Sequence, residues 1–356
     1  MRKVLVMAGG TGGHVFPALA IAEALRTQHI DVEWLGTRQG IESKLVPDHG
    51  FKLNYLNIGG IRGKSLLKKL LAPWQLCKAI LQAIQILNLY QPDAVIGLGG
   101  FASGPGGIAA WLKKIPIFIH EQNAIPGFTN RILAYKASKL FESFPQTFAP
   151  KFNPILTGNP IRTTLLTLPP PTIRFEQHIG PLRILVMGGS LGAQALNEVV
   201  PNALHLLSQE KFEILHQTGR SGLTATQTEY QRLNLNANVV PFIDDMAKAY
   251  RWADLVICRA GALTVSELAV VGKAAILVPL PQAADDHQFY NAQYLARKNA
   301  AICIRQSELS PRRLTDEILR LGKNPAEILE LAKRAKQQAQ LSATDTIVAW
   351  CQSYLS

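Results

Sequence analysis

The sequence is poor in cysteine and has no long apolar run. The four cysteines, Cys77, Cys258, Cys303 and Cys351, are far apart and form no C-x-x-C pair. This spacing argues against a zinc site and a disulfide framework, and it favours a reducing cytosol. The first apolar run, residues 4–8, is too short for the core of a signal peptide, and no stretch approaches the roughly 18 consecutive apolar residues of a membrane span. We therefore expect neither secretion by that route nor a transmembrane protein.

The chain also has too few charged residues for a disordered protein. Charged side chains make up 17% and apolar side chains 47% of the sequence, which is typical of a globular protein. Its 356 residues exceed the roughly 250–300 at which a single hydrophobic core stops growing. Two domains are therefore expected.

Acidic residues are scarce in the first half of the chain. Residues 1–163 contain 18 basic and 8 acidic side chains and supply most of the net charge of +12. No acidic residue lies between Asp48 and Asp93, where basic residues alternate with leucines around Lys68 and Trp74. Such a stretch is typical of a segment on anionic lipid, and a solvated amphipathic helix is the alternative. Nucleic acid is a weaker interpretation, because aromatic residues for base stacking are scarce here and no recognition helix is present.

Short β-branched runs alternate with helical patterns, which predicts parallel sheets built from βαβ units. Residues 185–187 repeat the Leu-Val-Met of residues 5–7 at an offset of 180. We therefore predict an α/β protein with two doubly wound domains that face a central cleft, and ligands at the carboxyl ends of the strands. The proline-rich segment 168–171 is the expected linker, and residues 325–356 have a helical pattern.

Three glycine-rich turns follow predicted strands. Residues 9–14 follow the first strand and open a helix, so their N–H groups and the helix dipole suit a phosphate. Residues 97–107 repeat this arrangement in the same half, with Ser103 suited to a helix N-cap, and residues 188–193 do so in the second half. A tight turn that needs a positive φ is the alternative for any one of them. Together they predict two phosphorylated ligands, one per domain.

Polar side chains follow further strands at the same sheet edges. Glu267 comes shortly after the strand 255–258, where it either completes a capping box with Thr264 or accepts hydrogen bonds from two ribose hydroxyls. Residues 120–123 end the strand 115–119, and we favour a ligand role for them. No D-x-D motif and no metal-ligand histidine spacing is present, so we expect no protein-bound metal.

These motifs in combination resemble the MurG family, the bacterial UDP-N-acetylglucosamine–N-acetylmuramyl-(pentapeptide) pyrophosphoryl-undecaprenol N-acetylglucosamine transferases. The resemblance covers nearly the whole chain and is carried by GGTGGHVFPALA at 9–20, GGFASGPGG at 99–107, HEQNAIPGFTN at 120–130, GNPIR at 158–162, GGSLGAQALN at 188–197 and the run 242–288. It implies a GT-B fold with two Rossmann-like domains. It also implies inverting transfer of GlcNAc from UDP-GlcNAc to the C4 hydroxyl of MurNAc in lipid I, which forms lipid II for peptidoglycan and so serves cell shape and division.

The resemblance also assigns a role to each part of the chain. Residues 1–163 would bind the acceptor and associate with the cytoplasmic face of the cell membrane, residues 164–340 would bind UDP-GlcNAc, and residues 341–356 would form a last helix that can pack back on the first domain. The expected partners are UDP-GlcNAc, lipid I, an anionic membrane surface and other cell-wall enzymes. No cofactor is expected, because no motif for a protein-bound metal is present and UDP-GlcNAc would be a substrate.

The donor site implied by the resemblance draws mainly on the second domain. Ser190 and the helix start at 262–264 would hold the UDP diphosphate, and Glu267 would take the ribose hydroxyls. The backbone around Ile243 would contact uracil, and Arg162 would join from the hinge. The full set of implied donor residues is Thr11, Gly12, Gly13, Asn123, Arg162, Ser190, Ile243, Ala262, Leu263, Thr264, Val265, Ser266, Glu267 and Gln288.

The acceptor site implied by the resemblance lies in the first domain. Residues 11–13, which are also counted among the donor contacts, would face the pyrophosphate of the lipid. The GlcNAc hydroxyls of the donor would be bound by Gln288 and Asn123. The implied acceptor residues are Gly100, Ser103, Gly104, His120 and Asn130.

His14 is the predicted catalytic base. It follows the first glycine turn at a helix start, where the dipole disfavours imidazolium and keeps a neutral base available. Orienting the pyrophosphate is the alternative role. Three other functions also fit the motifs: a different UDP-sugar-dependent glycolipid transferase, a non-hydrolysing UDP-GlcNAc 2-epimerase, and a module that senses nucleotide sugars without turnover.

Overall fold

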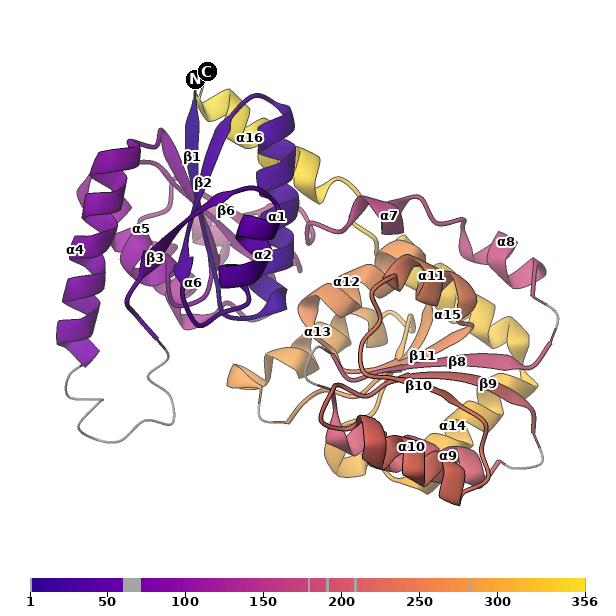
Figure 1. The fold of residues 1–356 in the computed structure, drawn as a ribbon. Helices are drawn as coiled ribbons and strands as arrows, with labels where there is room; N and C mark the ends of the chain where they lie inside the picture. Colours follow the sequence, from indigo (N-terminus) through magenta and orange to yellow (C-terminus); the bar gives the residue numbers. More distant parts are fainter. Residues whose placement is uncertain are drawn as a thin grey trace. The chain divides into compact units, whose positions relative to one another are not determined.

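The computed structural model describes residues 2–59, 72–178, 180–189, 192–207, 210–281 and 283–355 (Figure 1). The chain forms two compact units. The first comprises Met1–Ile161 together with Ser342–Ser356, and the second comprises Arg162–Leu341.

The described part of the first unit is built on a parallel sheet in the order β3-β2-β1-β4-β5-β6-β7. The order reverses between β1 and β4, which makes this the switch point where doubly wound sheets bind ligands. The strands are β1 Lys3–Ala8, β2 Asp31–Thr37, β3 Lys52–Leu56, β4 Ala94–Gly99, β5 Ile117–Glu121, β6 Lys139–Glu142 and β7 Ile155–Leu156.

Helices cover both faces of this sheet, which is why β1 is apolar and buried from Val4 to Ala8. Val4 and Val6 belong to one core cluster, and Leu5 and Met7 belong to the cluster on the other face. The described helices of the first unit are α1 Gly12–Thr27, α2 Glu42–Asp48, α4 Ala72–Tyr90, α5 Ser103–Leu112, α6 Phe128–Leu133, the 3-10 helix η1 Pro150–Phe152 and α16 Ala343–Leu355.

The second unit repeats the plan of the first. Its sheet has the order β10-β9-β8-β11-β12-β13, with the switch point between β8 and β11. The strands are β8 Leu182–Met187, β9 Phe212–Gln217, β10 Asn238–Val240, β11 Leu255–Cys258, β12 Ala274–Leu277 and β13 Ile302–Cys303. The helices are α7 Thr163–Leu166, α8 Pro171–Glu176, α9 Gln194–His205, α10 Leu223–Arg232, α11 Met246–Trp252, α12 Ala262–Val271, α13 His287–Ala296, α14 Pro311–Lys323 and α15 Pro325–Gln337, with the 3-10 helices η2 Ala284–Asp286 and η3 Gln306–Glu308.

Two Rossmann-like units in one chain constitute the GT-B fold, so the predicted fold class is confirmed. The repeat at an offset of 180 corresponds to β1 and β8, which stand at the switch points of the two sheets. None of the helices described is both long enough and apolar enough to span a lipid bilayer.

The last helix, α16, packs against the first unit. Ile347, Val348 and Cys351 are buried in the same core cluster as Val15 of α1. Figure 1 shows α16, in yellow, beside α1. The chain therefore passes from the first unit into the second and returns. The residues of α16 complete the core of the first unit.

The proline-rich segment 168–171 does not link the two units, so that prediction is wrong. The second unit begins at Arg162, and the segment lies inside it. Leu168 is buried, Pro171 begins α8, and α8 contacts α15. Packing of these apolar side chains therefore places the segment on the second unit.

The predicted N-cap at Ser103 is wrong, and the structure excludes the capping-box alternative for Glu267. Helix α5 begins at Ser103 itself, and the Ser103 hydroxyl lies within hydrogen-bond distance of carbonyl oxygens of Met7 (2.8 Å) and Gly99 (2.7 Å). Helix α12 begins after Gly261, which places Glu267 beyond the capping position. The observed N-cap residue is Ala102 for α5, one residue before Ser103, and Gly261 for α12, three residues before Thr264.

Candidate functional site

The two glycine turns of the first unit meet at its switch point. Gly9 follows β1, and Gly100 follows β4, the neighbouring strand. Gly100 has a φ of +87°, and a Cβ there would lie 2.3 Å from the carbonyl oxygen of Gly9. Both the backbone conformation and the close approach therefore require glycine at this position. The packed turns bring the N-terminal starts of α1 and α5 to one edge of the sheet.

His14 lies in the first turn of α1 and is partly exposed. Its Nδ1 is 3.3 Å from the hydroxyl oxygen of Thr11. A Cβ on Gly99 would lie 3.0 Å from His14 Nε2, so the imidazole ring rests against the second glycine turn. The predicted base thus stands beside both turns, and Gly12 and Gly13 form the start of its helix.

A buried carboxylate that the sequence did not reveal holds the first turn from beneath. Glu42 is completely buried. Its Oε2 accepts a hydrogen bond from Gly10 N (2.9 Å), and its Oε1 accepts bonds from the N–H (3.0 Å) and hydroxyl (2.8 Å) of Thr37. A Cβ on Gly9 would collide with this carboxylate. No motif marks Glu42, because 32 residues separate it from Gly10 and only the fold brings them together.

His120 is fully buried at the end of β5. Its Nε2 is 3.0 Å from the carbonyl oxygen of Gly158, and its Nδ1 is 3.0 Å from Gln122 Nε2. Burial lowers the pKa of His120 to about 4, so the imidazole is neutral near pH 7. The structure thus places this predicted acceptor residue inside the first unit, where it fixes the loop after β5.

Glu121 organises the same loop. Its carboxylate accepts hydrogen bonds from the backbone N–H groups of Asn123 (3.0 Å) and Gly127 (3.0 Å) and from Asn130 Nδ2 (2.9 Å). Asn130 is buried with Glu121, whereas Asn123 is partly exposed. Among the residues described, the buried side-chain oxygen of Asn130 has no hydrogen-bond partner. Gly104, the remaining predicted acceptor residue, lies in the first turn of α5.

The glycine turn of the second unit is tied to β9. Gly192 has a φ of +79°, and a Cβ there would lie 1.9 Å from the carbonyl oxygen of Thr218. Gln217 Nε2 donates to the carbonyl oxygen of Gly189 (2.9 Å). The turn therefore lies at the carboxyl edge of the second sheet. Ser190, the predicted diphosphate contact within it, lies outside the described residues.

Helix α12 starts directly after β11 at this edge. The first N–H groups of the helix, those of Ala262, Leu263 and Thr264, have no acceptor within the helix. Val265 donates its N–H to Gly261 O (3.0 Å) and buries its side chain. Ser266 is partly exposed in the second turn. A helix start of this kind suits an anion.

Glu267 is buried on α12 in contact with a residue that the sequence did not suggest. Its Oε2 accepts a hydrogen bond from the hydroxyl of Tyr250 on α11 (3.0 Å). Burial raises the pKa of the Glu267 carboxyl, and Arg162 and the Tyr250 hydrogen bond act against this rise. Arg162 itself is exposed at the start of α7. Tyr250 and Arg162 therefore help to keep a carboxylate in an apolar setting.

The other predicted donor residues of this unit lie on loops and on α13. Gln288, in the first turn of α13, accepts a hydrogen bond from Leu280 N (3.0 Å) and so ties the loop after β12 to the helix. Ile243 is partly exposed, next to Phe242, which is 52% exposed. Within the described parts of both units, no group of three or more His, Cys, Asp or Glu side chains is placed to hold a metal ion.

The two Rossmann-like units, each with a glycine turn at its switch point, have the GT-B fold, and matches to known domain families identify the class as glycosyltransferases. Residues 4–142 match the glycosyltransferase family 28 N-terminal domain, and residues 183–347 match the glycosyltransferase family 28 C-terminal domain. The chain therefore belongs to glycosyltransferase family 28.

Individual relatives are similar over nearly their whole length. The UDP-N-acetylglucosamine–N-acetylmuramyl-(pentapeptide) pyrophosphoryl-undecaprenol N-acetylglucosamine transferase of Coxiella burnetii is 45% identical, with 99% of each chain covered. The transferase of the same name from Nitrosococcus oceani is 48% identical, with 98% of each covered. The crystal structure of Acinetobacter baumannii MurG has a TM-score of 0.87 at 44% identity and covers 99% of this chain and 100% of that chain.

Proposed function

We propose that this chain transfers GlcNAc from UDP-GlcNAc to the C4 hydroxyl of MurNAc in lipid I, with inversion at the anomeric carbon, and so forms lipid II for peptidoglycan. The observation that carries the proposal is the packing of Gly9 against Gly100, which joins two anion-suited turns in the first unit. The second unit has a separate anion-suited helix start at Ala262. A reaction between two diphosphate-bearing substrates needs two such sites, and the names of the relatives agree with this reaction.

The donor would bind in the second unit. The N–H groups of residues 262–264 and the turn that holds Ser190 would grip the UDP diphosphate, because a helix start stabilises negative charge. This contact gains strength as UDP departs and its charge grows. Glu267, oriented by Tyr250, would accept hydrogen bonds from the ribose hydroxyls.

The acceptor would bind in the first unit. The joined glycine turns would face the pyrophosphate of the lipid, and His14 beside them would take the proton of the attacking hydroxyl. Proton removal by a positioned side chain contributes roughly 10²–10⁴-fold to rate. The buried Glu42 would not touch substrate but would hold the first turn in shape through Gly10.

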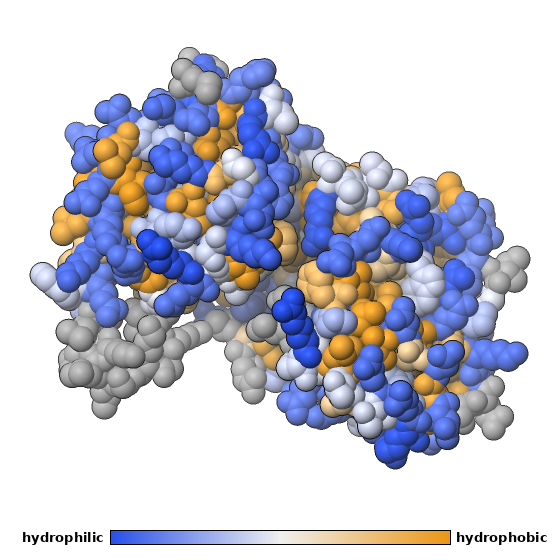
Figure 2. Space-filling model, in the orientation of Figure 1, coloured by the Kyte–Doolittle hydropathy of each residue, from blue (hydrophilic) through white to orange (hydrophobic). Residues whose placement is uncertain are grey.

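An exposed apolar surface on α4 and α5 supports association with a membrane. Trp74, Leu81 and Leu89 of α4 and Trp111 of α5 are exposed, and α4 contacts α5. Lys78 stands 5.4 Å from the centre of the Trp74 ring. Figure 2 shows apolar surface over α4, on the left of the first unit, among hydrophilic residues. Lys68, the other residue expected to touch lipid, lies outside the described residues.

Rings and cations on one surface suit the interface of an anionic leaflet. We therefore propose that the chain is a peripheral protein of the cytoplasmic membrane face, where lipid I and other cell-wall enzymes would be its partners.

Labelled UDP-GlcNAc distinguishes the proposal from its alternatives. The purified protein is incubated with the labelled donor, with and without a lipid I analogue, and the label is followed. Label in a lipid-linked disaccharide supports the transfer. Label in UDP-ManNAc without acceptor would indicate the epimerase, and intact donor in a stable complex would indicate a sensor. Transfer to a different glycolipid in preference to lipid I would indicate another transferase.

A further inference from the structure

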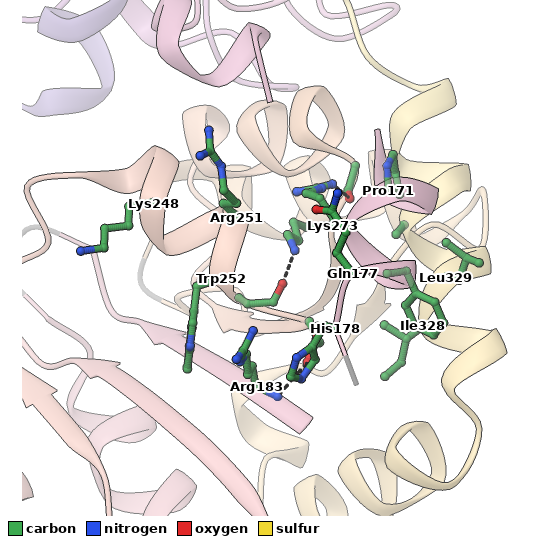
Figure 3. Close-up of a pocket in the computed structure, with 16 residues that line it drawn as sticks. Pro171, Gln177, His178, Arg183, Lys248, Arg251, Trp252, Lys273, Ile328 and Leu329 are labelled. Carbon is green, nitrogen blue, oxygen red and sulfur yellow. Dashed lines mark hydrogen bonds and ion pairs between the residues drawn. The ribbon is translucent and has the colours of Figure 1, made fainter. Parts of the chain in front are cut away.

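A cavity of about 290 Å³ opens in the second unit, at the edge of the sheet opposite to the glycine turn (Figure 3). Arg183, Asp254 and Lys273 line it. These residues lie at or just before the amino-terminal ends of β8, β11 and β12. The donor residues predicted for this unit follow the carboxyl ends of strands in the same sheet. The cavity is therefore a different place from the proposed donor site.

A buried guanidinium with unused donors lines the cavity. Arg174 of α8 is only 7% exposed. Its Nη2 donates to the carbonyl oxygens of Val271 and Gly272 at the end of α12. Its Nε and Nη1 are buried and have no hydrogen-bond partner among the described residues. Three of the five N–H donors of this side chain therefore lack an acceptor.

Two further cations, Lys273 and Lys336, lie near enough to Arg174 for its charge to act on them. Lys273 is 5% exposed, and its ammonium donates to the carbonyl oxygen of Ala253, as the dashed line in Figure 3 marks. Lys336 donates to the carbonyl oxygen of Val270. Burial, helped by the charge of Arg174, lowers the pKa of Lys273 to about 7. The environment thus disfavours a further positive charge, and it would favour a negative one.

The rim of the cavity is basic as well. Arg183, Arg251 and His178 contribute to the lining. Asp254 is the one acidic residue among the described residues that line the cavity. Its Oδ2 is already engaged, 3.3 Å from His178 Nε2 and 2.9 Å from Arg183 N. The charge of Asp254 acts on Lys273, but this single carboxylate stands against Arg174, Arg183, Lys248, Arg251 and Lys273 in the lining.

Capping of a helix end explains only part of this cluster. Cations near the last carbonyls of a helix are favourable, which accounts for Arg174 Nη2 and for Lys336. It does not account for Arg174 Nε and Nη1, because buried donors without an acceptor are costly. A ligand that brings several oxygen acceptors and negative charge would supply what these groups lack.

We propose that this cavity binds a small phosphate-bearing anion, with Arg174 and Lys273 as its principal contacts and Arg251 at its rim. Phosphate oxygens accept charge-assisted hydrogen bonds from guanidinium and ammonium groups. The cavity volume of about 290 Å³ is several times the roughly 30 Å³ that a water molecule occupies in the liquid. Both inorganic phosphate and a small phosphate monoester therefore fit the site.

The proposal is tested by calorimetric titration of the full chain with inorganic phosphate and, separately, with glycerol 3-phosphate, at constant ionic strength set with chloride. We expect saturable binding that persists when UDP-GlcNAc is present at saturation. Tighter binding of glycerol 3-phosphate would identify a monoester as the ligand, and tighter binding of inorganic phosphate would identify the free ion. Both results support the site.

Variants locate the binding. Arg174→Gln should weaken it roughly tenfold or more, as expected for loss of hydrogen bonds from a charged group. Arg251→Gln, at an exposed rim position, should weaken it less and tests the site even if Arg174→Gln does not fold. Arg312→Gln removes the same charge from α14, outside the cavity, and should leave the affinity unchanged.

Three results would each overturn the proposal. One is the absence of saturable binding of either probe, and another is binding that UDP-GlcNAc abolishes. The third is an affinity that Arg251→Gln, and Arg174→Gln where it folds, change no more than Arg312→Gln does.

Discussion

Buried carboxylates shape the loops of both candidate sites. Glu42 holds the first glycine turn through Gly10, and Glu121 holds the loop after β5 through Gly127. Glu267 is buried against Tyr250 in the second unit. A buried carboxylate is costly unless it is hydrogen-bonded. Glu42 and Glu121 accept these bonds from N–H groups of their loops, and Glu267 accepts its bond from the hydroxyl of Tyr250 on the neighbouring helix.

Replacing His14 tests the proposed base. His14→Ala removes the imidazole that stands beside both glycine turns, so turnover should fall by about 10²–10⁴-fold. Titration with UDP-GlcNAc should give an unchanged dissociation constant, because the proposed contacts of the UDP diphosphate and ribose lie in the second unit. Unchanged turnover would remove His14 from the mechanism, and a drop accompanied only by a higher KM for the lipid would favour the alternative role of orienting the pyrophosphate.

Replacing Glu42 tests the support of the first turn. The amide of Glu42→Gln keeps the shape but cannot accept hydrogen bonds with both of its terminal atoms, so the contact to Gly10 or to Thr37 is lost. We expect the ratio kcat/KM for the acceptor to fall about tenfold or more, with donor affinity preserved. Glu23→Gln on α1, a partly exposed position whose carboxylate is 3.7 Å from His49 Nε2, is the matched control. Equal kinetics of the two variants would show that Glu42 has no positioning role.

At the scale of elements, the strands and helices follow local sequence patterns. Which strands and helices pack against one another does not follow from these patterns. The predicted strands at 115–119 and 255–258 correspond to β5 and β11, with bounds that agree within about two residues. Ser103 does not cap α5, because its hydroxyl donates to the carbonyl oxygens of Met7 and Gly99. The residue types at a helix start thus did not fix the N-cap position in α5 or in α12.

The exposed surface of α4 provides a test at this scale. Replacing Trp74 and Leu81 with serine removes large apolar side chains that are 63% and 61% exposed. If these side chains enter lipid, sedimentation with anionic vesicles should weaken by about tenfold or more, because each buried apolar side chain contributes roughly 1.5–3 kcal/mol. Leu206→Ser, at an exposed position of the second unit, should sediment like the unaltered protein. Unchanged sedimentation of the double variant would contradict the proposed membrane surface.

At the scale of the whole molecule, each unit contains a buried histidine that links its stability to pH. Burial lowers the pKa of His120 to about 4 in the first unit and that of His216 to about 3 in the second. An unfolded histidine has a pKa of roughly 6.5. Between these values the unfolded chain binds more protons than the folded chain, so acid favours unfolding.

The free energy of unfolding of each unit should therefore fall as the pH drops below about 6.5, by up to about 1.4 kcal/mol per pH unit for each histidine. Urea denaturation at several pH values between about 4 and 7 measures this slope. His216→Gln, which cannot take up the proton, should flatten it for the second unit, and His205→Gln at an exposed position should not. An equal slope in all three proteins would exclude the buried imidazole as the cause.

The sequence by itself determined the two-domain α/β class, the strands and the three glycine turns, because these depend on short patterns that each segment contains. The resemblance to the MurG family agrees with the matches to the two glycosyltransferase family 28 domains and with the names of the similar proteins. The roles of individual residues stay predictions. Only the tertiary structure decided that Gly9 packs on Gly100, that Glu42 lies under the first turn and that α16 returns to the first unit. It also decided that Arg174 and Lys273 meet in one cavity. These contacts join residues far apart along the chain, so they depend on the order of the strands, which no local pattern specifies.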